Sequence, residues 1–285
     1  MTDAIRPPQI RVAVIPVAGK GTRWNPITRS VAKELLPVWR RTSASYAFEE
    51  AIAAGIEEVI FVVSPDKHGV FEHFLRFDAS DLGARYQGES PRHLHERVKV
   101  RACIQEEARG LGHAILCAEN DVANRPFAVL LPDEVLMENG LSRIIGITPS
   151  VLLMEVPYAQ RSHYGIVAGH EHHGRVTITD LVEKPDPALA PSGLAVTGRY
   201  TFNPDIFDYL RTQEPGHHGE IQLTDAMRRL TADHPISGVI YRGTRHDVGQ
   251  PMGLLTASLD FALKDPEYRD QVRKEVEALL HTDAR

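Results

Sequence analysis

The stretch from Val12 to Arg23 constrains the fold of this chain more than any other. It opens with the unbroken apolar run Val12–Ile15, whose length and β-branching are typical of a strand buried on both faces of a sheet. The sequence then changes to AGKGTR, in which two glycines allow the backbone to turn sharply and to bring its N–H groups close to an anion. We therefore expect a central strand followed by a loop that can hold phosphate.

Charged residues close to this loop strengthen that interpretation. Lys33 and Glu34 follow Arg23 within the same short segment, which thus supplies a backbone cradle, two cations and a carboxylate. An ordinary strand-to-loop turn would account for Gly19 and Gly21 alone, but not for these charges. The combination is suited to a nucleoside triphosphate.

Two commoner glycine loops are excluded by their spacing. A Walker A loop requires a Lys followed by Ser or Thr after its second Gly, whereas Lys20 lies between the glycines and is followed by Gly21. A dinucleotide fingerprint requires a third Gly three positions after Gly21, where this chain has Trp24. The second mismatch also argues against an NAD-dependent enzyme.

Strand-like and helix-like segments alternate along the first two-thirds of the chain. The expected strands are 12–15, 58–63, 98–104 and 127–131, and the expected helices are 43–54, 66–77 and 111–118. This alternation predicts a Rossmann-like α/β fold with a mixed, mostly parallel twisted sheet flanked by helices, and with ligands at the carboxyl ends of the strands. We expect residues 1–285 to form a single domain.

Three further segments have recognisable patterns. Residues 80–97 are polar and irregular, which predicts a loop whose two histidines are solvated, because no nearby acid or thiol completes a metal site. Residues 171–174 are expected to form a hairpin turn between strands 164–168 and 175–182. Residues 266–281 carry one apolar stripe at helical spacing, suited to docking on the body of the protein or on another subunit.

Composition limits the classes of partner. The net charge of -6, with acids and bases interspersed, argues against nucleic-acid binding, and no apolar run approaches the ~20 residues of a membrane span. The N-terminus has neither the charged nor the apolar region of an export signal, so we expect a cytoplasmic protein. Cys103 and Cys117 are far apart and outside any CxxC spacing, which favours free thiols.

Two polar groups stand at expected strand ends. Gln105 and Gly110 lie between a strand and a helix, where an amide can match the edge of a pyrimidine base and a glycine lets the ring lie against backbone, although a solvated Gln is the commoner case. Asp133 directly follows a buried strand, so it can either ligate Mg²⁺ beside a triphosphate or cap a helix.

The second half of the chain contains a candidate sugar site. Glu183 can accept two hydrogen bonds from vicinal hydroxyls, and Lys184 can contact a sugar phosphate. In an extended strand these neighbours would point in opposite directions unless Pro185 bends the chain. Asp247 is a candidate second magnesium ligand, or a loop carboxylate that caps a helix starting near Met252.

Several blocks together resemble a known family. They occur in family order between Val12 and Leu255 and read AGKGTR, AKELLP, QEEARGLG, LLPDE, YG, LVEKP, GRY, EIQLTDA and HDVG. They are similar to those of the sugar-nucleotide pyrophosphorylases and, more closely, of the bacterial UTP–glucose-1-phosphate uridylyltransferases. The resemblance implies a nucleotide-diphospho-sugar transferase fold, with a nucleotide part at about 8–135, a sugar part at about 150–250 and C-terminal helices at 251–285.

The resemblance also implies a reaction and its residues. UTP and glucose 1-phosphate would give UDP-glucose and pyrophosphate, with Mg²⁺ as cofactor and without a protein nucleophile. Arg23, Lys33 and Lys184 would neutralise charge at the α-phosphoryl group. The implied nucleotide-binding residues are Ala18, Gly19, Gly21, Thr22, Glu34, Gln105 and Gly110; the sugar-binding residues are Gly165, Glu183, Lys184, Val196 and Gly198; the metal ligands are Asp133 and Asp247.

The chain also departs from the family pattern beside the nucleotide loop. Ala32 replaces the usual Pro, Asn25 replaces an aliphatic residue, and residues 39–42 read WRRT in place of an Asp-basic-Pro triplet. Two alternatives therefore remain open: a nucleotidyltransferase for another nucleotide or sugar 1-phosphate, and a non-catalytic paralogue that binds sugar nucleotides. Members of the family are usually dimers or tetramers, so we expect a homodimer or homotetramer.

Overall fold

The structure is a computed structural model that describes residues 9–67, 69, 98–216 and 219–282. The expected loop 80–97 and most of the expected helix 66–77 lie outside these residues. The main sheet comprises β1 (Val12–Pro16), β4 (Glu58–Val63), β5 (Lys99–Ile104), β6 (Phe127–Leu130), β8 (Ser150–Glu155), β9 (Gly165–His172), β10 (Arg175–Glu183), β11 (Leu194–Phe202) and β12 (Ile236–Ile240). Two small ribbons pair β2 (Pro37–Val38) with β3 (Arg41–Thr42) and β7 (Glu134–Leu136) with β13 (Arg245–Asp247).

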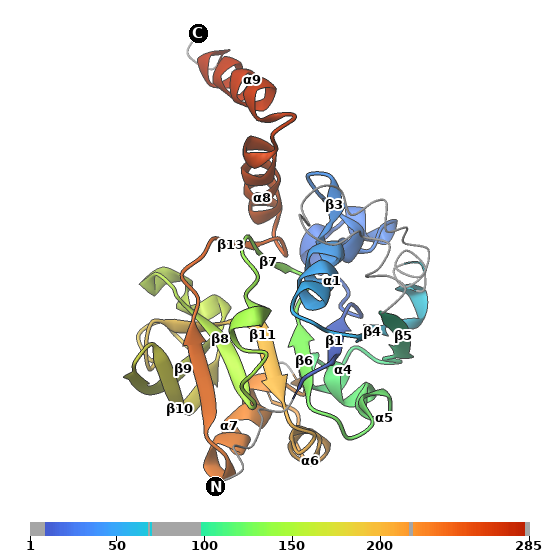
Figure 1. The fold of residues 1–285 in the computed structure, drawn as a ribbon, viewed down its shortest axis with the longest axis vertical. Helices are drawn as coiled ribbons and strands as arrows, with labels where there is room; N and C mark the ends of the chain where they lie inside the picture. The colour runs from blue at the N-terminus through green and yellow to red at the C-terminus, as the bar shows by residue number, and fades with distance from the viewer. Residues whose placement is uncertain (1–8, 68, 70–97, 217–218, 283–285) are drawn as a thin grey trace, which may run out of the picture.

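Helices flank this sheet, except for the two C-terminal ones, which project from it, as Figure 1 shows. The α-helices are α1 (Ser43–Ala53), α4 (Leu111–Cys117), α5 (Glu119–Val122), α6 (Ile206–Arg211), α7 (Leu223–Asp233), α8 (Pro251–Lys264) and α9 (Arg269–Thr282). Short 3₁₀ turns are η1 (Thr22–Trp24), η2 (Ile27–Arg29), η3 (Lys33–Leu35), η4 (Pro65–Lys67), η6 (Leu141–Arg143) and η7 (Tyr158–His163). None of the helices in the described ranges is long and apolar enough to cross a membrane.

The strand order confirms a mixed α/β sheet with β1 in an inner position. The order is β5-β4-β1-β6-β11-β8-β12-β10-β9. The first four strands are parallel, as the alternating pattern predicts, whereas β11 runs antiparallel to both of its neighbours. β9 and β10 form the hairpin that the sequence predicts, whereas the antiparallel pairing of β11, which joins the two halves, was not indicated by the sequence pattern.

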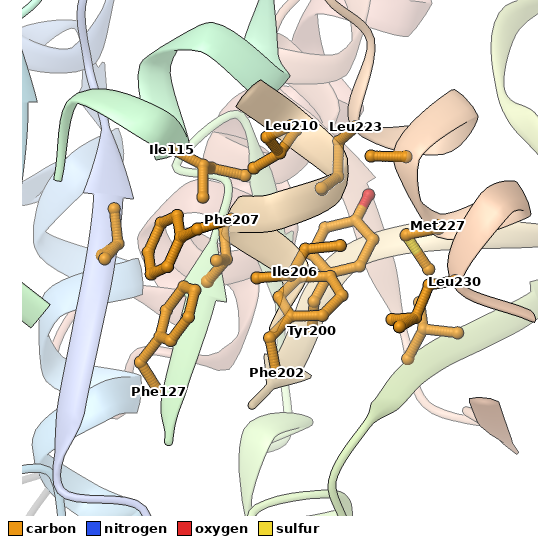
Figure 2. Close-up of a cluster of buried hydrophobic side chains, with 14 of the residues drawn as sticks. Ile115, Phe127, Tyr200, Phe202, Ile206, Phe207, Leu210, Leu223, Met227 and Leu230 are labelled. Atoms are coloured by element: carbon orange, nitrogen blue, oxygen red, sulfur yellow. The ribbon is translucent and has the colours of Figure 1, made fainter. Parts of the chain in front are cut away.

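The inner strands β1, β4 and β6 are buried on both faces of the sheet, as expected for the apolar run of β1. Val12 and Val14 face a core formed with α4, α6 and α7, whereas Ala13 and Ile15 face a core that includes residues of α1. Figure 2 shows part of the first core, where the rings of Phe127 and Phe207 stack with centroids 5.2 Å apart. Burial on both faces fixes the sheet, so that the loops at the carboxyl ends of its strands are held in place.

The C-terminal helices extend away from the sheet, as Figure 1 shows. A small cluster that includes Val38, Val135, Val248 and Phe261 packs α8 against the two ribbons. The C-terminal end of the apolar stripe on α9 does not dock on the body: Leu279 and Leu280 are exposed, with 69% and 71% of their surface accessible. The expected helix begins at Arg269, three residues later than its pattern indicated.

Candidate active site

The glycine loop lies directly after β1, and the side chain of Lys33 runs along it. Gly21 has a left-handed backbone with φ of 64°, which a residue with a side chain adopts at a cost. A Cβ placed on Gly21 would lie 3.4 Å from the Lys33 Cβ, and one on Gly19 would lie 3.9 Å from the Lys33 Cε. The structure thus brings loop and lysine together, as their sequence proximity suggested.

Lys33 pairs with Asp133, which follows β6 on the neighbouring strand. The Lys33 Nζ lies 2.9 Å from the Asp133 Oδ2. Burial opposes charge on both groups, but their attraction is stronger, so the pKa of Lys33 is raised and that of Asp133 is lowered. The positive charge of Arg23 contributes to the lowered pKa of Asp133, which places its exposed side chain in the same electrostatic neighbourhood.

Asp133 and Asp247 converge beside Gly249. A Cβ on Gly249 would lie 3.0 Å from the Asp247 Oδ1 and 3.4 Å from the Asp133 Oδ2. Neither aspartate caps a helix: Asp133 is followed by strand β7, and Gln250 is the N-cap of α8. Mg²⁺ prefers one or two carboxylates together with phosphate oxygens and water, so the donor chemistry of this pair fits the ion. No group of three or more metal-binding side chains occurs among the described residues.

Gln105 and Gly110 form an internal contact at the end of β5. The Gln105 Nε2 donates a hydrogen bond to the Gly110 carbonyl at 3.2 Å and lies 2.9 Å from the His113 Nδ1. Gln105 is only 4% exposed, so it is not the solvated strand-end amide that sequence alone allows. Gly110 has φ of 101°, and a Cβ there would lie 2.7 Å from the Ile221 carbonyl oxygen, so this position requires glycine.

The candidate sugar residues surround Gly165. A Cβ on Gly165 would lie 3.2 Å from the Glu183 Oε2, 3.2 Å from the Thr224 Oγ1 and 3.3 Å from the Val196 Cγ2. Thr224 donates a hydrogen bond of 2.7 Å to Glu183 and so fixes one carboxylate oxygen. Four separate segments therefore meet at one point, and three of them were predicted as sugar-binding.

Lys184 leaves the strand, which resolves the geometry of the Glu183–Lys184 pair. Its φ of 43° is left-handed, and its N–H donates to the Tyr164 carbonyl at 3.1 Å. The Lys184 Nζ consequently lies 3.2 Å from the Glu183 Oε1, on the same side as the glutamate. The bend occurs at Lys184 itself, immediately before Pro185.

Gly198 lies where strand β11, which carries the candidate sugar-binding residue Val196, contacts the loop that carries Asp133. The register of β11 shifts between Val196 and Tyr200, and Gly198 lies in this bulge with φ of 71°. A Cβ there would lie 2.9 Å from the Leu131 Cβ and 3.0 Å from the Glu134 Cγ. The glycine thus allows close contact between the two halves of the site.

An Arg–Glu pair that the sequence analysis missed joins the halves. Arg245 forms an ion pair with Glu134 and donates a hydrogen bond to the Tyr164 hydroxyl at 2.9 Å. Burial, together with Asp133 and Asp247, raises the pKa of Glu134 against the opposing effect of Arg245. Their positions in the sequence could have indicated these contacts, because Arg245 lies two residues before the candidate metal ligand Asp247 and Tyr164 directly precedes the candidate sugar-binding residue Gly165.

Lys67 is a second residue that the sequence analysis missed. It follows the buried strand β4, which pairs in parallel with β1, so it comes to the end of the sheet at which the glycine loop lies. Its Nζ donates to Glu34 at 2.9 Å, and Glu34 is 2% exposed. A lysine at a strand end beside the loop strand was the signal that could have found it.

The unusual WRRT segment contacts the C-terminal helices. The Trp39 Nε1 donates to the Asp265 Oδ2 at 2.9 Å, and the Trp39 ring meets that of Tyr268 edge to face. Arg40 pairs with Glu267 at 3.1 Å. The WRRT segment therefore attaches α8 and α9 to the rest of the protein.

Of the predicted nucleotide-binding residues in the glycine loop, Ala18 is buried and Thr22 is exposed.

Comparisons with known proteins agree with this geometry. A family model described as nucleotidyl transferase matches residues 12–263. The chain is 38% identical to a UTP–glucose-1-phosphate uridylyltransferase of Bacillus subtilis (strain 168) over 96% of its length and 99% of the relative's, and 37% identical to one of Staphylococcus haemolyticus (strain JCSC1435), with 95% and 99% covered.

Solved structures give the same result. A UDP-glucose pyrophosphorylase complexed with UDP-glucose superimposes with a TM-score of 0.83 at 34% identity, covering 90% of this chain and 100% of the other. A UTP-bound UGPase from Acinetobacter baumannii gives a TM-score of 0.80 at 32% identity, with 94% and 98% covered. The chain therefore belongs to the nucleotidyl transferase family, in which the relatives it resembles are UTP–glucose-1-phosphate uridylyltransferases.

Proposed function

We propose that this protein transfers a uridylyl group from UTP to glucose 1-phosphate, giving UDP-glucose and pyrophosphate. A phosphate oxygen of glucose 1-phosphate attacks the α-phosphorus of UTP, the bond between the α-phosphorus and the bridging oxygen breaks, and pyrophosphate leaves with that oxygen. The observation that carries this proposal is the arrangement of two sub-sites at one end of the sheet. The Lys33–Asp133 pair lies beside the glycine loop, and Arg245 links it through Glu134 to the sugar residues.

The residues of the chain act by position and charge. Lys33 and Arg23 offset the negative charge that develops on the α-phosphoryl group, and Lys184 holds the phosphate of the sugar. Glu183, oriented by Thr224, accepts hydrogen bonds from sugar hydroxyls. We assign uracil binding to Gln105 and Gly110, the pair joined by a hydrogen bond at the end of β5. The nucleotide part at about 8–135 and the sugar part at about 150–250 thus contribute to one site within a single domain.

Magnesium is part of this proposal. Asp133 and Asp247 would hold Mg²⁺, which when bound supplies positive charge next to the phosphate oxygens. We expect titration of Mn²⁺, followed by its paramagnetic resonance, to show a site in the UTP complex that Asp133→Asn and Asp247→Asn both weaken. Unchanged Mn²⁺ binding in both variants would remove these residues as ligands.

The substrates are tested by a pyrophosphate-release assay. Four nucleoside triphosphates, including dTTP, are combined with several sugar 1-phosphates, and UTP with glucose 1-phosphate is expected to give the highest kcat/KM. A preference for another pair would identify a different nucleotidyltransferase, and binding without pyrophosphate release would identify a non-catalytic paralogue. Arg23→Ala should lower turnover by roughly 100-fold, whereas Arg273→Ala, a change to an exposed arginine on α9, should have no effect.

We further propose that the protein is a cytoplasmic homodimer or homotetramer. The support is the exposed apolar stripe on α9, which includes Leu279 and Leu280. Light scattering on the purified chain gives the mass of the assembly, and Leu279→Glu with Leu280→Glu is expected to lower it. A monomeric mass for the unchanged chain would refute the assembly, without any consequence for the reaction.

A further inference from the structure

All three N–H donors of the Lys67 ammonium group are hydrogen-bonded within the protein. Its Nζ donates to the Val17 carbonyl at 3.0 Å, to the Gly19 carbonyl and to the Glu34 Oε2 at 2.9 Å. An ammonium has three N–H donors, and these three acceptors satisfy all of them. The side chain is 9% exposed. Lys67 therefore has no donor left for a substrate, which distinguishes it from Lys33.

The two carbonyl contacts determine the direction of the glycine loop. In a trans peptide the C=O and the following N–H point in opposite directions. Because the carbonyls of Val17 and Gly19 point to Lys67, the N–H groups of Ala18 and Lys20 point away from it. No other described residue accepts a hydrogen bond from the N–H groups of residues 18–21. The N–H groups of Ala18 and Lys20 are thus directed to the side away from Lys67, where an anion can meet them.

The contact with Glu34 also arranges charge. Glu34 is buried, and its Oε1 has no hydrogen-bond partner among the described residues, with the Lys33 Nζ 3.9 Å away. Lys67, Glu34, Lys33 and Asp133 therefore form a row of alternating charges. Lys67 balances the carboxylate of Glu34, which leaves Lys33 in contact with Asp133 and available to the substrate phosphates. Without Lys67, only Lys33, which also pairs with Asp133, would be left to offset the negative charge of Glu34 beside a triphosphate.

We propose that Lys67 is a positioning residue for nucleotide binding: it holds the carbonyl side of the glycine loop and balances Glu34, so that the loop N–H groups face the triphosphate. This inference rests on the proposed function of the site, because it deepens the role of the nucleotide half. Lys67 touches no reacting atom in this arrangement. Its effect is on the affinity for UTP, while the sugar residues around Gly165 are unaffected.

The test replaces Lys67 with Met, which keeps the length of the side chain and removes its charge and donors, and with Arg, which restores both. Lys99→Met is the matched control, because Lys99 is an exposed lysine on the adjacent strand β5. For each protein we would measure UTP affinity by calorimetry, KM for each substrate, kcat, and hydrogen exchange of peptides covering residues 17–24.

Lys67→Met is expected to weaken UTP binding by about 100-fold and to speed exchange in the loop, with the KM for glucose 1-phosphate within about twofold of the unchanged protein. Lys67→Arg should regain part of the UTP affinity, and Lys99→Met should behave like the unchanged protein. A purely structural role would instead change both KM values, or the melting temperature, without a selective effect on UTP.

Unchanged UTP affinity and loop exchange in a folded Lys67→Met protein would overturn the proposal. If this variant does not fold, Lys67→Gln, which keeps a donor, gives the same comparison, and equal UTP affinity there would also overturn it. The binding and exchange measurements do not depend on turnover. An unchanged protein that binds UTP but makes no UDP-glucose would refute the proposed reaction while leaving the Lys67 comparison decisive.

Discussion

Replacement of the buried Arg199 gives the sharpest test of how the site is held together. Arg199 is 0% exposed, and its guanidinium donates five hydrogen bonds. Two reach the Glu50 Oε2, at 3.0 and 2.8 Å, and three reach the carbonyls of Leu131, Gly198 and Glu134. All five donors of the group are used. Because Leu131 and Glu134 flank Asp133, the same side chain supports the fold and the loop that carries Asp133.

The expected loss of stability follows from the buried pair. Removing one partner of a buried ion pair costs about 3–5 kcal/mol, because the other charge remains uncompensated. Unfolding entropy of about 2.1 cal/mol/K per residue gives roughly 0.6 kcal/mol/K for 285 residues. Arg199→Met should therefore lower the melting temperature by about 5–8 °C. Turnover should fall by about 100-fold, because the loop carrying Asp133 loses its fixed position.

A second substitution separates charge from hydrogen bonding. The Glu50 Oε1 accepts from the N–H groups of Gly140 and Leu141, at 3.1 and 2.8 Å. Glu50→Gln keeps an oxygen for these donors and removes the charge that Arg199→Met leaves unpaired. The double variant should thus regain about half of the lost stability, but not the lost turnover.

Calorimetry or urea unfolding, together with pyrophosphate release, checks both expectations. Arg175→Met is the matched control, because Arg175 is exposed on β10 of the same sheet and should change stability by no more than about 0.5 kcal/mol. A fall of less than about 2 °C for Arg199→Met would refute the reasoning. So would a double variant that is less stable than the single one.

Three further predictions concern the site and the glycines. Lys33→Ala should lower kcat by at least about 100-fold with a smaller effect on melting temperature, and equal turnover would remove its catalytic role. Gly198→Ala should destabilise more than Gly174→Ala: both positions have left-handed φ, which costs about 1–2 kcal/mol, but only a Cβ at 198 meets another residue, Leu131 at 2.9 Å. Comparable unfolding midpoints for the two would contradict this. The contribution of the Lys33–Asp133 pair to stability should be constant at neutral pH. Because the pKa of Asp133 is lowered in the folded protein, the stabilisation from this carboxylate is present above pH 3.8 and is lost as the pH falls through its folded pKa. Because the pKa of Lys33 is raised, the stabilisation from its ammonium group is present below pH 10.5 and is lost only at higher pH. Unfolding free energies of the unchanged protein and Asp133→Asn should therefore differ by a constant amount between about pH 8 and 9, which lies above the pKa of about 7 to which Asp133 helps to raise Glu134, and a difference that varies in that window would count against the pair.

The sequence indicated the local elements correctly where a single physical cause determined them. The apolar run of β1 and the strand Glu58–Val63 required burial on both faces, and α1 ends where Gly55 stops it. Hydrophobic pattern and turn chemistry act over a few residues and can be read from the chain. The family blocks added the expected sub-sites, whose members the structure brings together at Gly165 and Gly249.

Other features required the tertiary structure because they depend on residues far apart in the chain. Lys67 meets the glycine loop only because β4 lies beside β1, and Arg245 meets Tyr164 across 81 positions. The antiparallel placement of β11 is likewise a property of sheet order, which hydrophobic pattern does not encode. The sequence by itself determined the type of each element and the chemistry available at its end. Tertiary structure decided which of these ends meet, because a charge acts on its neighbours in space, over a few ångströms, whatever their separation along the chain.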